Sequence, residues 1–473
     1  MFLTNISLFA IISPLLIGFF SFLLKDRKPI FFNAFFLVLV LISFFYLLYS
    51  VIALNLASGK EYPIMIGGWS KAMGIELKYN IQNAFVVLFL TLVMIVFLSS
   101  VMTEKNNYEI RGFAFIMLCG ANGLALTNDV FNSYVFFEIV CITSYIVYSH
   151  GKSIKCLKNA YNYIILSGFV GAIFLICIGL LYQITGHLNL DLISNVLKTY
   201  SNNKSISAIF ILFTIAMIFK IGVYPLHNIL TEIYKHLQTK YLVFVAGISS
   251  IIYPYFIAKF IIKLFGNAVI MNNEYLNIAL KIFGGIGFMF FNLNAIATKN
   301  VLNFIIALSF AQTSLFAFCL PFFTGKQVII GIIFAITSNG IIKVCLLAML
   351  SKIQEKTNIT EIKKTDISNI SCLSYKILFI ALLFFVAGMP LSLVFMSKWY
   401  LMIGIFNSSS TIWLTILITG FAIDIFACFS FIRQIITKKE KVLQVKKDNY
   451  VVLSIIFVIF ILIISSFFTG SFN

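Results

Sequence analysis

The sequence contains 473 residues, of which 61% are hydrophobic and 11% are charged, and its mean hydropathy is +1.03. This composition excludes an ordinary soluble domain and indicates an integral membrane protein. The formal net charge is +18, but the basic residues are scattered between apolar blocks. This pattern is typical of loop charges that orient a membrane protein, and it argues against a nucleic-acid-binding surface.

Apolar windows of about twenty residues predict fourteen membrane-spanning helices. The first has no basic residues before it, so we expect a retained span rather than a cleaved signal peptide. We place the fourteen spans at residues 5–24, 30–53, 81–102, 112–127, 130–149, 160–184, 205–230, 241–262, 275–297, 301–320, 328–350, 375–397, 410–433 and 449–470. The chain is therefore predicted to be all-α, with a single membrane domain over residues 1–473.

The Lys and Arg residues of the loops predict the orientation. Twenty-one fall in odd-numbered loops, Arg111 among them, and eight fall in even-numbered loops, Lys259 among them. The positive-inside rule then places both termini outside and loops such as 352–366 and 433–448 in the cytoplasm. The bias toward Phe, Ile, Lys and Asn is typical of an AT-rich bacterial genome, so we expect a bacterial inner membrane. The longest external segment, 54–80, is Gly-rich and is predicted to form a small hairpin cap.

Several charged residues lie inside predicted spans, where each costs about 2.5–3.5 kcal/mol at a helix centre. Such residues usually face a protein interior and mark an ion or proton path. Lys281 is near the end of its helix and can extend to the interface instead. Asp424 has no evident partner, and it is either a relay or a buried hydrogen-bonded acid. Lys299, at the cytoplasmic edge, is either a relay or an interfacial anchor. The remaining residues of this group are Glu138, Lys220, Lys343 and Lys398.

Two spans carry helix-breaking residues close to a lysine. Gly222 and Pro225 follow Lys220, and Gly388 and Pro390 precede Lys398. Such residues free backbone carbonyls, and interrupted helices at the midplane build binding sites in transporters. The two interrupted spans occupy corresponding positions in two stretches of five helices, which is consistent with an inverted repeat.

Glu138, in VFFEIVCITSY, is an acid inside an apolar run. If it pairs with Lys220, removing either charge leaves the other buried alone. Glu138 then acts as an electrostatic switch for the protonation of Lys220, because an adjacent carboxylate favours a charged amine. A static ion pair that locks two helices is the alternative.

The blocks that contain these residues resemble a known family. They include GGWSKAMGIEL, FAFIMLCGANGLALTNDVFNSYVFFEIVCITSYIVY, FKIGVYPLH, NGIIKVCLLAML and AGMPLSLVFMSKWYL. Their order is similar to that in the antiporter-like membrane subunits of respiratory complex I, membrane hydrogenases and Mrp-type multisubunit cation/proton antiporters. Within this family the chain most resembles the D-type subunits of Mrp antiporters.

The resemblance implies two inverted five-helix repeats, at 112–262 and 275–433, each with a broken helix, between flanking helices in 1–102 and 449–473. It also implies that protons move along a chain of buried residues. In that chain Glu138 is the acid, and Lys220, Lys343 and Lys398 are the relay lysines.

The sequence also departs from the family pattern. The relay lysine of the eighth span falls on Ile251, which carries no proton, and a histidine of the eleventh span appears as Asn339. His227 is retained, and it is either a group that titrates near neutral pH or a structural imidazole. Either water with Ser249 or Ser250 bridges the gap between the lysines, or transport through this chain is impaired.

The resemblance leaves three functions open. The first is a proton-translocating subunit of a Na⁺/H⁺ or other monovalent-cation antiporter, with other membrane subunits as partners. The second is a subunit of a redox-driven translocase such as complex I, and only then would the chain be part of an enzyme. The third is a non-conducting scaffold. We expect no cofactor, since the sequence has no dinucleotide-binding or Walker pattern. We also expect no metal site, since its eight cysteines are scattered without a C-x-x-C pair or a nearby histidine.

Overall fold

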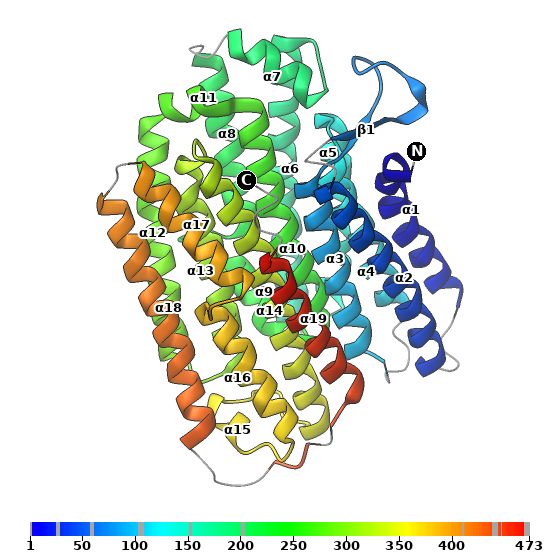
Figure 1. Cartoon of the computed structure of the whole chain (residues 1–473), viewed down its shortest axis with the longest axis vertical. Coiled ribbons are helices and arrows are strands. Elements are labelled where there is room, and N and C mark those ends of the chain that lie inside the picture. Colours follow the sequence, from blue (N-terminus) through cyan, green and yellow to red (C-terminus); the bar gives the residue numbers. More distant parts are fainter. Residues whose placement is uncertain are drawn as a thin grey trace.

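The computed structural model describes residues 2–24, 29–56, 61–102, 108–150, 154–199, 204–408, 411–437, 443–445 and 447–467. The helices form a bundle along the long axis of the molecule (Figure 1). They are α1 (Phe2–Leu23), α2 (Pro29–Leu56), α3 (Ile81–Ser100), α4 (Tyr108–Leu126), α5 (Val130–Ser149), α6 (Ile154–Thr185), α7 (Leu190–Thr199), α8 (Lys204–Ile221), α9 (Asn228–His236), α10 (Thr239–Phe260), α11 (Gly266–Asn272), α12 (Glu274–Ala297), α13 (Val301–Cys319), α14 (Lys326–Thr357), α15 (Lys364–Ser368), α16 (Leu373–Ala387), α17 (Leu393–Asn407), α18 (Thr411–Thr437) and α19 (Asn449–Phe467). A π-helical segment, Ile261–Phe265, joins α10 to α11.

The prediction of an all-α membrane protein is confirmed. Within the described ranges, 13 helices are long and apolar enough to cross a membrane. The predicted span 375–397 differs from the structure, because two shorter helices, α16 and α17, occupy this region on either side of a break. The inverted repeats stay a prediction.

Three helices form the centre of the bundle. These are α3, α14, and α10 with its π-helical extension. In each of them, 89% of the most hydrophobic stretch of 18 residues is buried. In the outer helices α1, α6 and α18, between 33% and 39% of the corresponding stretch is buried, and large apolar side chains are exposed. A helix that is apolar all round belongs in the interior, whereas an exposed apolar face suits lipid. Polar groups on the central helices are thereby shielded from lipid.

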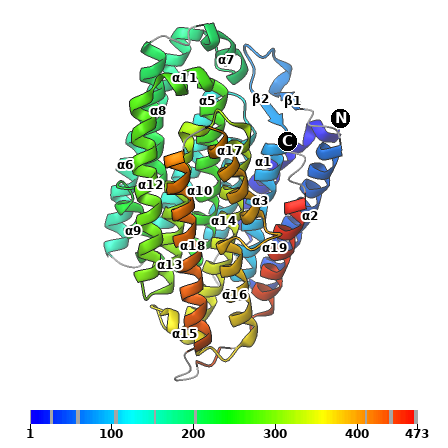
Figure 2. The same ribbon diagram turned by 60° about the vertical axis from the view of Figure 1, so that its left-hand side comes forward.

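The predicted hairpin cap is confirmed for its described part. Strands β1 (Tyr62–Met65) and β2 (Glu76–Tyr79) pair antiparallel, with Tyr62 opposite Tyr79. The hairpin and α7 lie at one end of the bundle, and α15 lies at the other (Figures 1 and 2). The predicted loop 352–366 is therefore at the opposite end from the hairpin, while the loop 433–448 lies partly outside the described residues.

Both predicted helix interruptions are present. The helix α8 ends at Ile221, and Gly222 follows with φ 71°. The helix α16 ends at Ala387, and Gly388 follows with φ 90°. Glycine adopts this left-handed conformation without the clash that a Cβ brings, so it ends a helix readily. Each break lies close in sequence to one of the predicted relay lysines.

Arg111 was predicted to be a loop residue, and this is wrong. It is fully buried in α4, where its Nε donates to Ser21 Oγ on α1 (2.8 Å) and its Nη1 donates to Asn33 Oδ1 on α2 (2.5 Å). Its guanidinium also lies 4.6 Å from the ring centroid of Phe36. These polar and aromatic contacts compensate for the loss of water around the charge. Arg111 thus joins α4 to the peripheral helices α1 and α2.

Candidate functional site

Lys220 occupies an aromatic cage at the end of α8. The residue is 3% exposed, and its Nζ donates a hydrogen bond to Ser167 Oγ on α6 (2.7 Å). Four ring centroids surround Nζ, those of Tyr163 (4.7 Å), Tyr253 (5.2 Å), Phe137 (5.4 Å) and Tyr145 (5.7 Å). Aromatic faces attract a cation, so the cage favours the ammonium form without a carboxylate in contact.

Glu138 lies near this cage but does not form an ion pair with Lys220. Between these two described residues the structure has no N···O contact within 4.0 Å. The carboxylate instead lies against Gly171 on α6, in the space that a Cβ there would fill. Ser167, the acceptor for Lys220, is one helical turn from Gly171. The two charged residues therefore reach α6 at successive turns, and a direct pair is not formed.

Lys343 lies on α14 between two small cavities. The structure gives its amine no hydrogen-bond partner among the described residues, and its side chain lines both cavities. The smaller cavity, of about 30 Å³, is lined by Lys220 as well as Lys343. The larger, of about 50 Å³, extends from Lys343 toward Val386 at the end of α16. The cavities thus connect the surroundings of two predicted relay lysines and approach a third.

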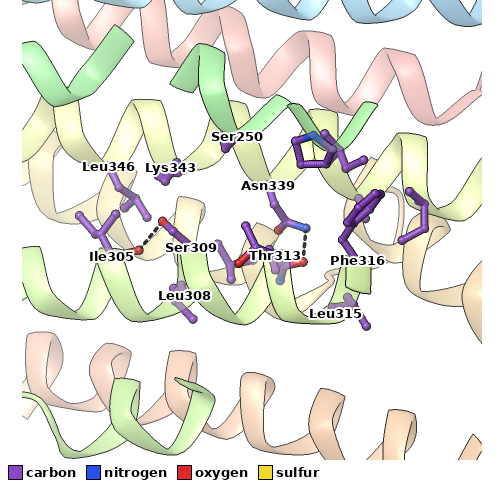
Figure 3. Close-up of a pocket in the computed structure, with 17 residues that line it drawn as sticks. Ser250, Ile305, Leu308, Ser309, Thr313, Leu315, Phe316, Asn339, Lys343 and Leu346 are labelled. Atoms are coloured by element: carbon purple, nitrogen blue, oxygen red, sulfur yellow. Dashed lines mark hydrogen bonds between the residues drawn. The ribbon is translucent and has the colours of Figure 1, made fainter. Parts of the chain in front are cut away.

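Hydroxyl and amide groups line these cavities. Ser250, Ser309 and Thr313 border both, and Figure 3 shows them around Lys343 in the larger one. Asn339 donates to Gln312 Oε1 across the larger cavity (3.1 Å). A water molecule needs about 10–15 Å³ of such volume and two or more polar partners. The two cavities are therefore large enough and polar enough for a few water molecules.

Ile251 fills the position where the family pattern implies a lysine. It is fully buried on α10, and its side chain occupies the space beside Gly340 of α14. It offers no proton-binding group, as the sequence predicts. The neighbouring Ser250 lines both cavities, whereas Ser249 lines only the smaller one.

Lys398 and Asp424 form a buried ion pair. Lys398 Nζ lies 2.7 Å from Asp424 Oδ2, and the two residues are 8% and 0% exposed. The amine also donates to the carbonyl oxygens of Ala387 (3.1 Å) and Val386 (3.3 Å), at the end of α16. Asp424, for which the sequence indicated no partner, is thus paired across the α17–α18 interface.

His227 and Lys299 lie away from the cavities. His227, between α8 and α9, packs against the ring of Phe291 with a centroid distance of 4.6 Å, and its Nδ1 has no hydrogen-bond partner among the described residues. Lys299 is exposed between α12 and α13, and its backbone carbonyl accepts from the Lys364 amide (2.8 Å). Neither side chain lines either cavity.

Two other lysines form helix caps that the sequence did not reveal. Lys259 was predicted to be an outer-loop charge, and this is wrong. It is buried in α10 and donates to the carbonyls of Ala125 and Thr127 at the end of α4, each at 2.7 Å. Lys364, in α15, is buried and donates to the Ala295 carbonyl at the end of α12 (2.7 Å). A cation satisfies the unpaired carbonyls of a helix end. Burial lowers the pKa of the Lys364 amine from its usual value near 10.5 to about 8.

A charged network attaches the hairpin to the bundle. Lys78 Nζ lies 2.6 Å from Asp191 Oδ2 on α7 and 3.0 Å from Glu61 Oε2. Burial acts to lower the pKa of Lys78, but its bonds to Asp191 and Glu61 outweigh burial and raise it. The buried Glu76 accepts from the side-chain amides of Asn128 (2.7 Å) and Asn189 (2.6 Å). The network fixes β2 to the α4–α5 turn and to the start of α7.

Comparisons with known proteins agree with this architecture. Residues 127–423 match the family model described as "NADH:quinone oxidoreductase/Mrp antiporter, TM". The D-type subunit of the Na⁺/H⁺ antiporter of Alkalihalophilus pseudofirmus is 25% identical over 306 residues, which are 63% of this chain and 60% of that protein. A putative antiporter subunit, mnhD2, of Staphylococcus aureus is 29% identical over 212 residues, which are 44% of this chain and 42% of that protein. The matched part thus spans less than two thirds of these relatives.

Solved structures share the fold along nearly the whole chain. A chain of the Mrp complex from Dietzia sp. superposes with a TM-score of 0.81 at 14% identity, covering 99% of this chain and 96% of that one. A chain of respiratory complex I from Thermus thermophilus gives 0.82 at 15% identity, covering 100% and 97%. A chain of the archaeal membrane-bound sulfane sulfur reductase gives 0.86 at 19% identity, covering 99% and 96%.

At these identities the structural likeness establishes the fold alone. The family model, however, matches well over half of the 473 residues. The chain therefore belongs to the NADH:quinone oxidoreductase/Mrp antiporter family of transmembrane proteins.

Proposed function

We propose that this chain is a proton-translocating membrane subunit of a multisubunit monovalent-cation/proton antiporter in a bacterial inner membrane. Its curated relatives are named as the D-type subunit of a Na⁺/H⁺ antiporter and as a putative antiporter subunit. Other membrane subunits are its partners, because those names describe one part of a larger assembly. The predicted repeats, 112–262 and 275–433, are the two halves through which protons move.

One observation carries the proposal: a single cavity of about 30 Å³ is lined by both Lys220 and Lys343. An amine is a proton donor or acceptor, and burial changes its affinity for the proton strongly. Two amines that face one polar cavity are placed to exchange a proton through one or two water molecules. Residues of α13 and of the central helices α10 and α14 line the cavity on one side, and Lys220 of α8 lines it on the other.

Each predicted relay residue has a role in this arrangement. Glu138 biases the charge of Lys220 from a distance, across the Ser167 turn of α6. Lys220 passes the proton to Lys343, and the larger cavity leads from Lys343 to the Val386 turn beside Lys398. Glu138, Lys220, Lys343 and Lys398 thus form a row of proton-binding residues, which we call the proton row. Asp424 holds Lys398 at the end of this row.

Ile251 does not break the row in this proposal. The hydroxyl groups of Ser250, Ser309 and Thr313 lie in both cavities, so they replace the missing amine by ordering water. The same residue supports the alternative that the chain is a scaffold, because Ile251 removes one titratable group from the family's row.

The test uses the assembled complex in vesicles, with sodium-dependent quenching of a pH-sensitive dye as the measurement. Lys220→Ala and Lys343→Ala are expected to lower sodium-driven proton movement by at least about a hundredfold, which is the lower end of the effect of losing one positioned proton-transfer group. Lys299→Ala, at an exposed lysine outside the cavities, is the matched control and is expected to retain the rate. Normal transport in both relay variants, with normal assembly, would establish the scaffold instead.

The neighbouring genes test the remaining alternative, a redox-driven complex. Genes for small multi-helix antiporter subunits beside this one support the antiporter. Genes for hydrophilic iron–sulfur subunits would assign the chain to a redox-driven pump.

A further inference from the structure

The amine of Lys398 lies in a cage of three oxygen atoms, and the ring centroid of Phe421 lies 5.2 Å from its Nζ. Asp424 Oδ2, the Ala387 carbonyl and the Val386 carbonyl lie 2.7, 3.1 and 3.3 Å from its Nζ. The break after α16 creates the two carbonyl ligands. Pro390, four residues after Val386, has no N–H to donate to the Val386 carbonyl, and no backbone amide donates to the Ala387 carbonyl in the described part of the chain.

Two further buried oxygens lack partners, one on Asp424 itself and one on Asn292 of the neighbouring helix α12. Asp424 Oδ1 and Asn292 Oδ1 have no hydrogen-bond donor among the described residues, although both side chains are fully buried. Asn292 lies on α12, and its Nδ2 contacts the Gly420 carbonyl of α18 (3.4 Å). Gly420 is one helical turn before Asp424, so the amide of Asn292 lies next to the turn that carries the acid. A buried oxygen without a donor is rare, and it indicates either strain or a ligand.

We propose that these oxygens form a binding site for a monovalent cation of the sodium type, and that the cation and the Lys398 ammonium exclude each other there. Carboxylate, amide and carbonyl oxygens are the ligands of hard cations. The single carboxylate neutralises one positive charge, which excludes a divalent ion because the excess charge would stay buried. The proposal deepens the proposed function and rests on it for the statement that this cation is the one transported.

Mutual exclusion follows from the geometry. A cation bound to Asp424 and to the two carbonyls takes the place of Nζ, and two positive charges at that distance repel strongly in a low-dielectric interior. The Lys398 amine therefore releases its proton toward the larger cavity and moves aside when the cation binds, so that the single carboxylate still faces one positive charge. Gly388 leaves room beside it, since a Cβ at position 388 would contact Cδ, Cε and Nζ of Lys398 at 3.3–3.6 Å. Val386 also lines the larger cavity, so this cavity reaches the wall of the cage.

The experiment measures equilibrium binding of sodium-22 to the purified complex. Asp424→Asn keeps the shape of the acid and removes its charge, and it is expected to abolish the sodium binding that this chain contributes. Asn292→Leu is expected to weaken that binding by about tenfold or less, since it removes one neutral ligand. Lys398→Met removes the competing cation, and it is expected to strengthen binding by at least about tenfold.

A matched control tests whether replacing any buried asparagine would change sodium binding. Asn122 on α4 is also buried and also has an unpartnered Oδ1 among the described residues, while its Nδ2 donates to the Ala10 carbonyl (2.8 Å). Asn122→Leu is expected to leave sodium binding unchanged. A complex whose sodium binding is the same in the wild type, Asp424→Asn and Lys398→Met overturns the site.

The outcomes also distinguish this inference from the proposed function. If sodium binding depends on Asp424 while the Lys220 and Lys343 variants transport normally, the site stands and the proton row fails. If transport depends on Lys220 and Lys343 while sodium binding ignores Asp424, the row stands and the site fails. Should Lys398→Met not assemble, Asn292→Leu still decides, because it keeps the branched shape of the side chain and leaves the Lys398–Asp424 pair in place.

Discussion

Gly171 on α6 provides the space that the Glu138 carboxylate occupies. A Cβ at position 171 would overlap Glu138 Oε1, while Tyr134 is the only other described residue with an atom near that point, at 4.0 Å. The glycine is therefore required by the acid rather than by the backbone, since it lies within a regular helix. This contact places the carboxylate near the Ser167 turn where the Lys220 amine is bound.

Gly171→Ala is expected to preserve folding and to impair transport. The clashing atom is the end of a flexible side chain, so the Glu138 carboxylate shifts while α6 keeps its packing. We expect sodium-driven proton movement to fall by about tenfold, because proton transfer depends steeply on the placement of charged groups. Dye quenching in vesicles measures the rate.

Gly168→Ala, three residues earlier on the same helix, is the matched control. Its added Cβ would meet no described atom within 4 Å, so transport is expected to stay normal. Alanine in a helix stabilises by about 0.5–1 kcal/mol relative to glycine, and the thermal unfolding temperature should rise slightly. Equal transport in the two variants would show that the position of Glu138 does not matter.

The hydroxyl groups of the two cavities give a second prediction. Ser250→Ala with Ser309→Ala removes two polar groups that order water between Lys220 and Lys343, and we expect about a tenfold lower rate of proton movement. The loss of stability should be small, because among the described residues both hydroxyls bond only to carbonyls of their own helices, at Gly247 and Ile305.

Ser338→Ala is the control for this pair. Ser338 is fully buried on α14 and bonds to its own helix in the same way, through the Phe334 carbonyl, but it lines neither cavity. Its rate is expected to match that of the wild type. A normal rate in the double variant would instead place the proton path elsewhere.

Lys364 gives a prediction about pH. Its pKa is about 8 in the folded chain and near 10.5 when unfolded, so between these values the unfolded chain binds more protons. The free energy of unfolding is therefore expected to rise as pH increases from about 8 to about 10.5. Thermal unfolding of the purified complex against pH measures this rise.

Lys364→Met supplies the comparison, since it keeps the length of the side chain and removes the titration. The difference in unfolding temperature between wild type and variant is expected to change over this pH window. A difference that stays constant from about pH 7 to about pH 10.5 would contradict the low pKa.

Much of the fold was predictable because membrane spans are long apolar segments. The two breaks were also predictable, because Gly222 and Gly388 adopt left-handed conformations that other residues resist. Lys220, Lys343 and Lys398 were found as charges within apolar runs, which is a local property of the sequence.

The surroundings of these lysines were not predictable from local patterns. Asp424 pairs with Lys398 only because α17 packs against α18, and the sequence does not state that packing. Ser167, the acceptor for Lys220, is an ordinary serine in an apolar helix. The cavity hydroxyls come from α10 and α13, and hydroxyl residues are common in membrane helices.

Lys259 gives the last prediction, because it is the buried lysine of α10 and so the obvious candidate to replace the amine that Ile251 lacks. Its amine is engaged by the carbonyls of Ala125 and Thr127, and it lines neither cavity. We therefore assign it a structural role. Lys259→Met is expected to lower the free energy of unfolding by about 1–3 kcal/mol, since two buried carbonyls lose their donor. Proton movement per assembled complex should stay near the wild-type rate. A tenfold slower rate in a complex of normal stability would instead make Lys259 part of the proton path.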